Sequence, residues 1–181
     1  MKTESIQVEK LHPPVSQRDH VQGAANASIT LVEYGDYECP ACGQAYWIIK
    51  KLQQALAGRL RFVFRNFPLT NIHPHAELAA EAAEAAAAQR KFWEMHDALY
   101  ENQNALEEED LAEYANDLSL DADKLLEEIE SGAYTGRVRE DFQSGVRSGV
   151  NGTPTFFING VRYDGAYDAE SLLAALARAA E

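Results

Sequence analysis

The only two cysteines of the chain share one short motif, Cys39-Pro40-Ala41-Cys42. In thiol–disulfide exchange the attacking species is a thiolate, which the unpaired N–H groups and the dipole of a helix N-terminus stabilise. The motif follows an apolar run, and Pro40 suits the first turn of a helix, where its missing N–H is not needed. We predict that Cys39 is the nucleophile, with a pKa of roughly 3.5 to 7.5, and that Cys42 resolves the mixed disulfide.

A second motif, Gly152-Thr153-Pro154-Thr155, leads directly into an apolar run far downstream. Peptide bonds before proline tolerate the cis form, and a cis-proline in a fold is usually a functional feature. We predict a cis bond between Thr153 and Pro154. The plainer alternative is an ordinary trans proline at the start of a strand.

The amino-acid composition of the chain restricts the kinds of function that it can have. The chain has 181 residues, of which 46% are hydrophobic, enough for one domain with a real core. With 16 basic and 29 acidic residues its net charge is −13, which would repel a nucleic-acid backbone. It contains no apolar run long enough to insert into a membrane, and residues 1–10 show no signal core. The sequence favours a cytoplasmic protein over a periplasmic or exported one that has lost its leader.

The first half of the chain predicts an arm, two strands and a helix. Residues 1–28 are polar and are expected to form an extended N-terminal arm. Residues 29–32 form a short run rich in strand-forming residues, as in a buried strand, and a helix is expected from Pro40 to about Leu56. From residue 60 apolar and arginine residues alternate, which predicts an edge strand. Residues 29–73 therefore form the first half of an α/β fold.

Residues 74–150 are helical in character, with apolar residues at helical spacing. Residues 155–158 and 161–163 flank Asn159-Gly160, a strong signal for a hairpin with a type I′ turn. Asp168 is expected to cap a last helix. The predicted order is strand, helix, strand, helical insertion, hairpin and helix, with residues 151–181 completing the fold.

Taken together, these motifs resemble the DsbA-like branch of the thioredoxin superfamily, from about residue 20 to the C-terminus. The resemblance rests on four segments, residues 33–42, 64–69, 91–96 and 152–160. It implies a thioredoxin-like α/β fold with a helical insertion between the second strand and the C-terminal hairpin. It also implies a redox-active disulfide that needs no cofactor and acts on protein or small thiols, with a thioredoxin- or glutathione-type redox partner. Oligomeric state stays open.

The resemblance assigns roles to further residues. It places the Thr153-Pro154 loop against the cysteines, where the backbone of Thr153, with Pro40 and Ala41, would contact an extended substrate segment. In this family an acid at the position of Glu33 helps to move protons at the buried cysteine. Burial raises a carboxyl pKa, so we expect Glu33 to accept the proton of Cys42. The alternative is a solvated glutamate.

Glu38, immediately before Cys39, departs from the strongly oxidising members, as does the absence of a histidine between the cysteines. A neighbouring negative charge disfavours a thiolate. We therefore expect Glu38 to tune the redox couple and the protein to be a weaker oxidant, unless that side chain simply points into water.

Three alternatives to an oxidoreductase stay open. His73 and His75 admit a structural zinc site with the cysteines, although their spacing does not match zinc motifs and we expect no metal. A relative of the same fold could act as a glutathione-dependent isomerase or transferase, which the second cysteine disfavours. A non-catalytic client-binding module would use the disulfide only as a brace.

Overall fold

The computed structural model describes residues 9–181 and confirms the predicted thioredoxin-like α/β architecture. Its elements run in this order along the chain: β1 His20–Gly23, β2 Ile29–Gly35, α1 Pro40–Leu56, a 3₁₀ turn at Ala57–Arg59, β3 Leu60–Asn66, α2 Ala76–Ala88, α3 Phe92–Glu101, α4 Glu108–Asp117, α5 Ala122–Glu130, α6 Thr135–Arg147, β4 Thr155–Ile158, β5 Val161–Tyr163 and α7 Ala169–Ala179.

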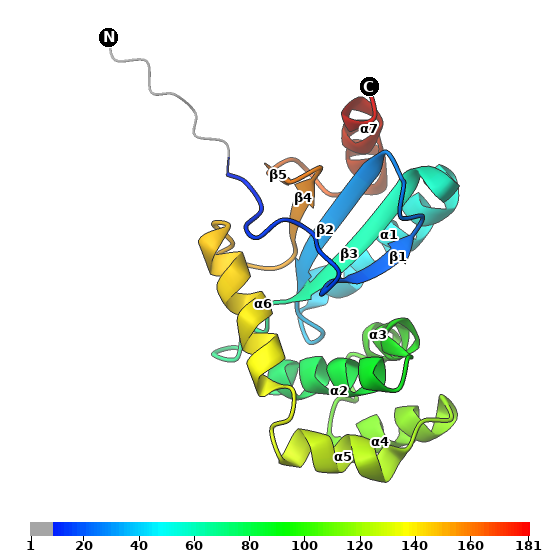
Figure 1. Ribbon diagram of the computed structural model, residues 1–181, viewed down its shortest axis with the longest axis vertical. Coiled ribbons are helices and arrows are strands. Elements are labelled where there is room, and N and C mark those ends of the chain that lie inside the picture. Colours follow the sequence, from blue (N-terminus) through cyan, green and yellow to red (C-terminus); the bar gives the residue numbers. More distant parts are fainter. Residues whose placement is uncertain (1–8) are drawn as a thin grey trace.

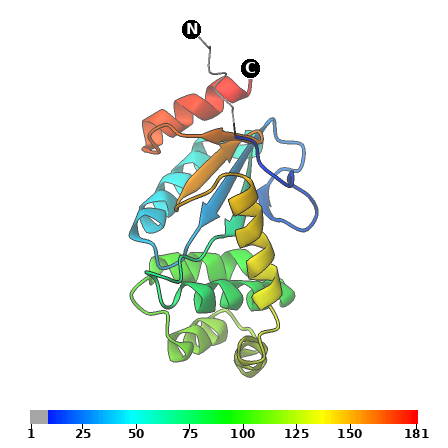
Figure 2. The same ribbon diagram turned by 90° about the vertical axis from the view of Figure 1, so that its left-hand side faces the viewer.

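The strands form one sheet in the order β1-β3-β2-β4-β5. β2 and β3 are parallel, and the other neighbouring strands are antiparallel. Helices α1 and α7 cover one face of the sheet, while α6 crosses the other (Figures 1 and 2). The sheet is therefore the middle layer of three, and its central strand β2 is buried along its whole length.

The alternation of side chains along β2 divides the core into two parts. Ile29 and Leu31 pack into the larger apolar cluster under α1 and α7, and Val32 and Tyr34 pack into the smaller one on the α6 face. Since successive strand residues point to opposite faces, Glu33 faces α1. This period-2 pattern brings a carboxyl group to the helix that carries the cysteines.

Helices α2 to α5 form a block beyond the end of the sheet at which β2 leads into α1 (Figure 1). The apolar pattern that runs through residues 78–99 is divided between two helices, because the chain turns at Arg90, whose φ is +65°. The predicted insertion thus contains five helices, counting α6, and its inner helices lie close to the candidate site.

Two details of the sequence prediction were wrong. Residues 1–28 are not only an arm, since β1 pairs antiparallel with β3. β3 is consequently an inner strand and not an edge strand. Its arginines are accommodated because they find partners: Arg61 donates to the Thr30 hydroxyl, and Arg65 is almost fully buried in an ion pair with Asp19.

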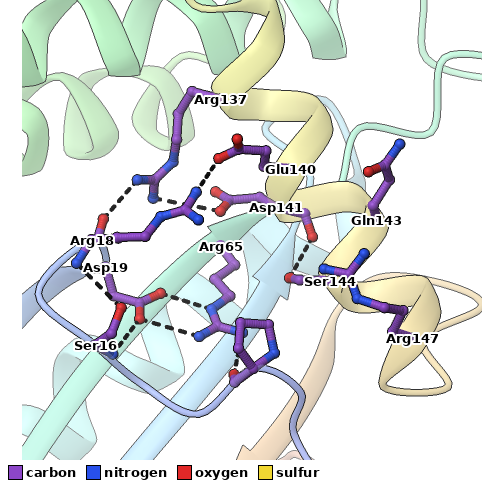
Figure 3. Close-up of a pocket in the computed structure, with 11 residues that line it drawn as sticks. Ser16, Arg18, Asp19, Arg65, Arg137, Glu140, Asp141, Gln143, Ser144 and Arg147 are labelled. Atoms are coloured by element: carbon purple, nitrogen blue, oxygen red, sulfur yellow. Dashed lines mark hydrogen bonds and ion pairs between the residues drawn. The ribbon is translucent and has the colours of Figure 1, made fainter.

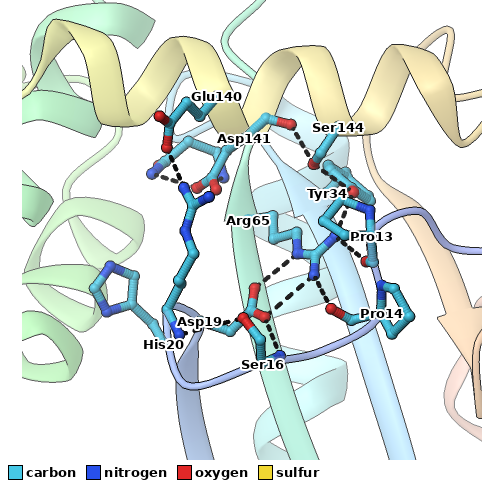
Figure 4. A network of polar contacts seen from close by, with 12 residues as sticks. Pro13, Pro14, Ser16, Asp19, His20, Tyr34, Arg65, Glu140, Asp141 and Ser144 are labelled. Carbon is cyan, nitrogen blue, oxygen red and sulfur yellow. Dashed lines mark hydrogen bonds and ion pairs between the residues drawn. The ribbon is translucent and has the colours of Figure 1, made fainter.

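Arg65 fastens the described part of the arm to the sheet (Figure 4). All five of its N–H groups have acceptors: both carboxylate oxygens of Asp19, the backbone carbonyls of Pro13 and Pro14, and the Tyr34 hydroxyl. Tyr34 in turn contacts the Ser144 hydroxyl at 2.7 Å. A guanidinium satisfied in this way is a structural anchor between the arm, β3 and α6.

A cavity of about 240 Å³ lies beside this anchor on the α6 face (Figure 3). Three guanidinium groups at the cavity are paired with carboxylates: Arg18 with Glu140, Arg65 with Asp19, and Arg137 with Asp141. Two of these ion pairs hold the arm and the third lies within α6, so the cavity is a space between ion pairs on the face of the sheet opposite α1.

The hairpin and the last helix follow the sequence prediction. Asn159 and Gly160 both have positive φ, +49° and +81°, as a type I′ turn requires. The Asp168 side chain accepts a hydrogen bond from the Ser171 N–H and caps α7. β4 pairs with β2 on its other side, and it begins directly after the Thr153-Pro154 loop.

Candidate active site

The two cysteines lie at the start of α1, at the end of the sheet that faces the helical block. Cys39 is the N-cap residue of α1, with extended backbone angles, and Pro40 begins the helix. Pro40 is exposed and Ala41 is half-buried, so the turn between the cysteines is the part that reaches the surface. Both cysteines are free thiols in this structure.

Cys39 has the properties of an activated nucleophile. The pKa of its thiol is lowered to about 5, chiefly by a hydrogen bond from the Cys42 thiol. Contacts with Thr153 and with the backbone N–H groups of Ala41 and Cys42 lower it further, against an opposing effect of burial. At neutral pH this sulfur is therefore a thiolate, in agreement with the predicted range.

Cys42 and Glu33 are both buried, and the pKa of each is raised. Cys42 is fully buried, and burial followed by the hydrogen bond to Cys39 raises its pKa well above the usual value. Glu33 is 1% exposed, and burial followed by the negative charge of Cys39 raises its pKa to about 8. Its Oε1 atom has no hydrogen-bond partner in the described part of the chain. The expected burial of Glu33 is confirmed, and the solvated alternative is excluded.

The loop before β4 lies against the nucleophile. The Cys39 sulfur is 3.6 Å from the carbonyl oxygen of Thr153. The peptide bond between Thr153 and Pro154 is cis, as the sequence predicted. The Thr155 hydroxyl donates to the Gly152 carbonyl at 2.7 Å, so this hydrogen bond joins the two residues that flank Thr153 and Pro154. Thr153 and Pro154 are half-buried, so part of their surface faces solvent beside the CxxC motif.

Two polar residues that sequence reasoning missed hold the turn that carries Cys39. Buried Asp36 accepts hydrogen bonds from the N–H groups of Glu38 and Leu69 and contacts the His73 ring, each at 2.8 Å. An aspartate that accepts the N–H two residues on is a recognisable turn signal. Sequence alone does not show that the same carboxylate reaches the loop before α2.

Gln103 is the second missed residue, and it comes from the connection between α3 and α4. Its amide donates to the carbonyls of Tyr37 at 2.8 Å and Cys39 at 2.9 Å. A Cβ on Gly43 would clash with the Gln103 amide oxygen, so the glycine makes room for this side chain. Nothing local to the sequence predicts a bond across such a separation.

Glu38, the predicted tuning residue, is bound by His75 at the start of α2. Its two carboxylate oxygens receive the His75 backbone N–H at 2.7 Å and contact the His75 Nδ1 atom at 2.9 Å. His73 contacts Asp36 in a parallel way. His73 and His75, which the sequence analysis weighed as zinc ligands, each contact a carboxylate of the segment before Cys39.

An aromatic layer separates the buried cysteine from the helical block. Tyr37 packs against Phe64 and Tyr100, and its hydroxyl lies 3.0 Å from Nδ1 of His96. Burial lowers the pKa of His96 well below its usual value, so the ring is neutral. These side chains exclude water from the region behind Cys42.

Comparisons with known proteins agree with this geometry. The family model described as Thioredoxin matches residues 15–178, nearly the whole chain. A thioredoxin-like oxidoreductase from Silicibacter pomeroyi DSS-3 is 28% identical, covers 91% of this chain and 93% of its own, and superposes with a TM-score of 0.80. BdbD from Bacillus subtilis, in its oxidised form, is 23% identical over 96% of this chain and 97% of its own, with a TM-score of 0.84.

The curated relatives are much longer proteins. Na(+)/H(+) antiporter NhaA 3 of Salinispora tropica is 46% identical over 169 residues, which are 93% of this chain and 26% of the antiporter. The chain thus spans about a quarter of the length of the curated relatives that it matches. Within residues 9–181, no helix is long and apolar enough to cross a membrane.

The expectation of a cytoplasmic protein gains no support from these comparisons. The match to the Thioredoxin family model, the superposition on thioredoxin-fold oxidoreductases and the paired cysteines at the start of α1 all point to one family. The chain belongs to the thioredoxin family, whose model matches residues 15–178.

Proposed function

We propose that this chain is a protein thiol–disulfide oxidoreductase that exchanges a disulfide between Cys39–Cys42 and protein or small thiols. The observation that carries the proposal is the opposite perturbation of the two thiols: the pKa of Cys39 is lowered to about 5, while that of Cys42 is raised. One sulfur is an anion ready to attack, and the other keeps its proton until it is needed.

In the reducing direction the Cys39 thiolate attacks one sulfur of a substrate disulfide. A bond forms between Cys39 and that sulfur, and the other substrate sulfur leaves as a thiolate that takes a proton from solvent. Cys42 then loses its proton and attacks the Cys39 sulfur, which releases the second substrate thiolate. Two electrons pass to the substrate and Cys39–Cys42 becomes a disulfide, so the reaction needs no cofactor. Oxidation of a substrate dithiol is the reverse sequence.

Glu33 is the proposed acceptor of the Cys42 proton. In the reduced state the charge on Cys39 contributes to the raised pKa of Glu33. That charge disappears when Cys39 enters the mixed disulfide, so this contribution to the pKa of Glu33 disappears as well. The carboxylate therefore becomes more available at the step in which Cys42 must be deprotonated.

The substrate is proposed to bind in extended form at the loop before β4. Thr153 and Pro154 lie beside Cys39 and are partly open to solvent, and the exposed Pro40 and half-buried Ala41 follow Cys39 directly in the chain. A peptide backbone that pairs with Thr153 would bring its own sulfur to Cys39.

A strongly stabilised thiolate favours the reduced form of the couple and therefore an oxidising protein. The pKa of about 5 for Cys39 argues against the expectation of a weak oxidant. We accordingly propose that the protein works in an oxidising compartment, such as the periplasm or the cell exterior, with a thiol-based redox partner that restores its disulfide.

The proposal is tested with cysteine variants of the full chain and a protein disulfide substrate. Cys39→Ser is expected to abolish exchange, whereas Cys42→Ser is expected to accumulate a mixed disulfide through Cys39, visible by non-reducing electrophoresis and mass spectrometry. Exchange that survives in Cys39→Ser, or a Cys42→Ser variant that forms no mixed disulfide, would overturn the proposal.

A further inference from the structure

His75 joins three segments of the chain beside the nucleophile. It lies at the start of α2, and its Nδ1 atom is 2.9 Å from Oε1 of Glu38, the residue that precedes Cys39. Its Nε2 atom is 3.0 Å from Oε1 of Glu107, the N-cap residue of α4. The ring therefore lies between two carboxylates, one of them covalently next to Cys39.

Both ring nitrogens face a carboxylate oxygen, which identifies the charge state of the ring. A neutral imidazole has one N–H and one bare nitrogen, so it could donate to only one carboxylate and would turn a lone pair toward the other. The doubly protonated ring donates to both. In agreement, the pKa of His75 is raised, first by its hydrogen bond to Glu38 and then, against the opposing effect of burial, by the charges of Glu107 and Glu38.

The two carboxylates differ in how firmly they are held. The Glu38 side chain is 20% exposed and receives both the backbone N–H and the ring of His75. The Glu107 side chain is 72% exposed and also takes part in the capping box at the start of α4. On its own helix His75 is followed by Glu77 in the first turn, and Asp36 and His73 form a separate pair in the preceding loop. Glu38 is therefore the partner that couples His75 to the cysteines.

We propose that His75 is a positioning residue for the exchange reaction, whose imidazolium ring fixes the carboxylate of Glu38, the residue before Cys39, and offsets its negative charge. This inference rests on the proposed function. A glutamate directly before the nucleophile would otherwise oppose the thiolate that the Cys42 thiol, Thr153 and the backbone N–H groups of α1 stabilise.

The consequence for the reaction follows from charge alone. With the ring protonated, Glu38 and His75 together carry no net charge. Without the ring charge, an uncompensated carboxylate remains one residue from Cys39 and disfavours its thiolate. The reduced form is then less stable relative to the disulfide, so the protein becomes a weaker oxidant.

The test uses His75→Gln, which removes the ring charge but keeps the backbone N–H that binds Glu38. The Cys39 thiolate is titrated by its ultraviolet absorbance, and the equilibrium with glutathione is measured at pH 7. We expect the thiolate midpoint to rise by about 1 pH unit and the glutathione equilibrium constant to shift toward the protein disulfide by up to about tenfold.

Two further variants separate charge from folding. Glu38→Gln combined with His75→Gln removes both charges and should return the thiolate midpoint to near the wild-type value. His12→Gln makes the same substitution at an exposed histidine outside the site and should change neither quantity.

The outcomes distinguish this inference from the function on which it rests. A wild-type protein without a reversible couple would overturn the proposed function. A reversible wild-type couple whose thiolate midpoint is unchanged in His75→Gln would overturn the inference alone, as would a rise in midpoint that persists in the double variant.

Discussion

The sulfur of Cys39 lies 3.6 Å from the carbonyl oxygen of Thr153, a contact between residues 114 positions apart in the chain. It brings together the end of β2, the start of α1 and the loop before β4, each of which is set by a separate local signal in the sequence. The same loop leads into β4, which pairs with β2 so that Phe156 lies opposite Glu33. The nucleophile, the loop proposed to bind substrate and the buried carboxyl group therefore share one rigid frame.

The reactivity of the two thiols should differ strongly with pH. Because the pKa of Cys39 is about 5, alkylation of this residue by iodoacetamide should rise through pH 5 and level off by pH 7. Cys42 should react slowly throughout, since it is buried and its pKa is raised. Mass spectrometry of timed samples locates the label.

Replacement of Cys39 by serine is the control for that measurement. The fast phase of labelling should then be absent. A fast phase that persists, or one whose midpoint lies near the usual thiol value of about 8.5, would contradict the assignment of Cys39 as the stabilised thiolate.

Glu33 should make the protein less stable as pH rises. Its folded pKa of about 8 lies above the model value of 4.5, so the folded state keeps a proton that the unfolded state releases between these two values. The free energy of unfolding contributed by Glu33 is therefore fully present below about pH 4.5 and falls progressively up to about pH 8. The loss is on the order of 3 kcal/mol or more.

Glu33→Gln removes this titration and should be more stable than the wild type at pH 8, with a flatter dependence of unfolding free energy on pH. Urea unfolding of the reduced proteins at pH 5 and pH 8 measures both effects. The same variant should slow the resolution of the mixed disulfide, because Cys42 loses its proposed proton acceptor. If the free energy of unfolding depends equally on pH in the wild type and in Glu33→Gln, Glu33 is not buried as a neutral acid.

Gln103 should stabilise the turn that carries Cys39. Gln103→Ala removes the donors to the Tyr37 and Cys39 carbonyls, and should lower the free energy of unfolding by about 1 to 2 kcal/mol. Gln44→Ala, at an exposed position of α1, is the matched control and should have little effect. If the two variants are equally stable in urea unfolding, Gln103 does not hold the turn.

The ion pair between Asp19 and Arg65 should be essential for the attachment of the arm. Asp19→Asn leaves a buried guanidinium without its counter-charge, and should lower the free energy of unfolding by about 3 kcal/mol. Arg18→Gln, which disrupts the exposed pair with Glu140, is the comparison and should change stability by less than about 1 kcal/mol. A similar small effect for both substitutions would mean that the arm contributes little to the fold.

The parts of the fold that the sequence predicted are those with strong local signals. Buried β2, the helix after Pro40, the Asn159-Gly160 turn and the Asp168 cap each depend on a few neighbouring residues. Strand β1 was not predicted, because its four residues are too few to show an alternation of apolar and polar side chains. β3 was misassigned as an edge strand because Arg65 looks solvated until its partner Asp19, 46 residues away, is known.

The same limit applies to the site. The cysteines, Pro154 and Glu33 were found because they lie within or close to recognisable motifs. Gln103 contacts the Cys39 carbonyl across 64 residues, and His75 contacts Glu38 across 37. Such contacts depend on how the helical insertion packs against the start of α1, which no periodicity in the sequence encodes.

The most direct test of the account is an equilibrium titration of the Cys39–Cys42 couple in glutathione buffers, followed by alkylation and mass spectrometry. We expect a reversible two-electron couple, with a potential more positive than the thioredoxin value of about −270 mV, because stabilisation of the Cys39 thiolate favours the reduced form. Cysteines that stay reduced, or stay disulfide-bonded, across the whole range of buffers would contradict it.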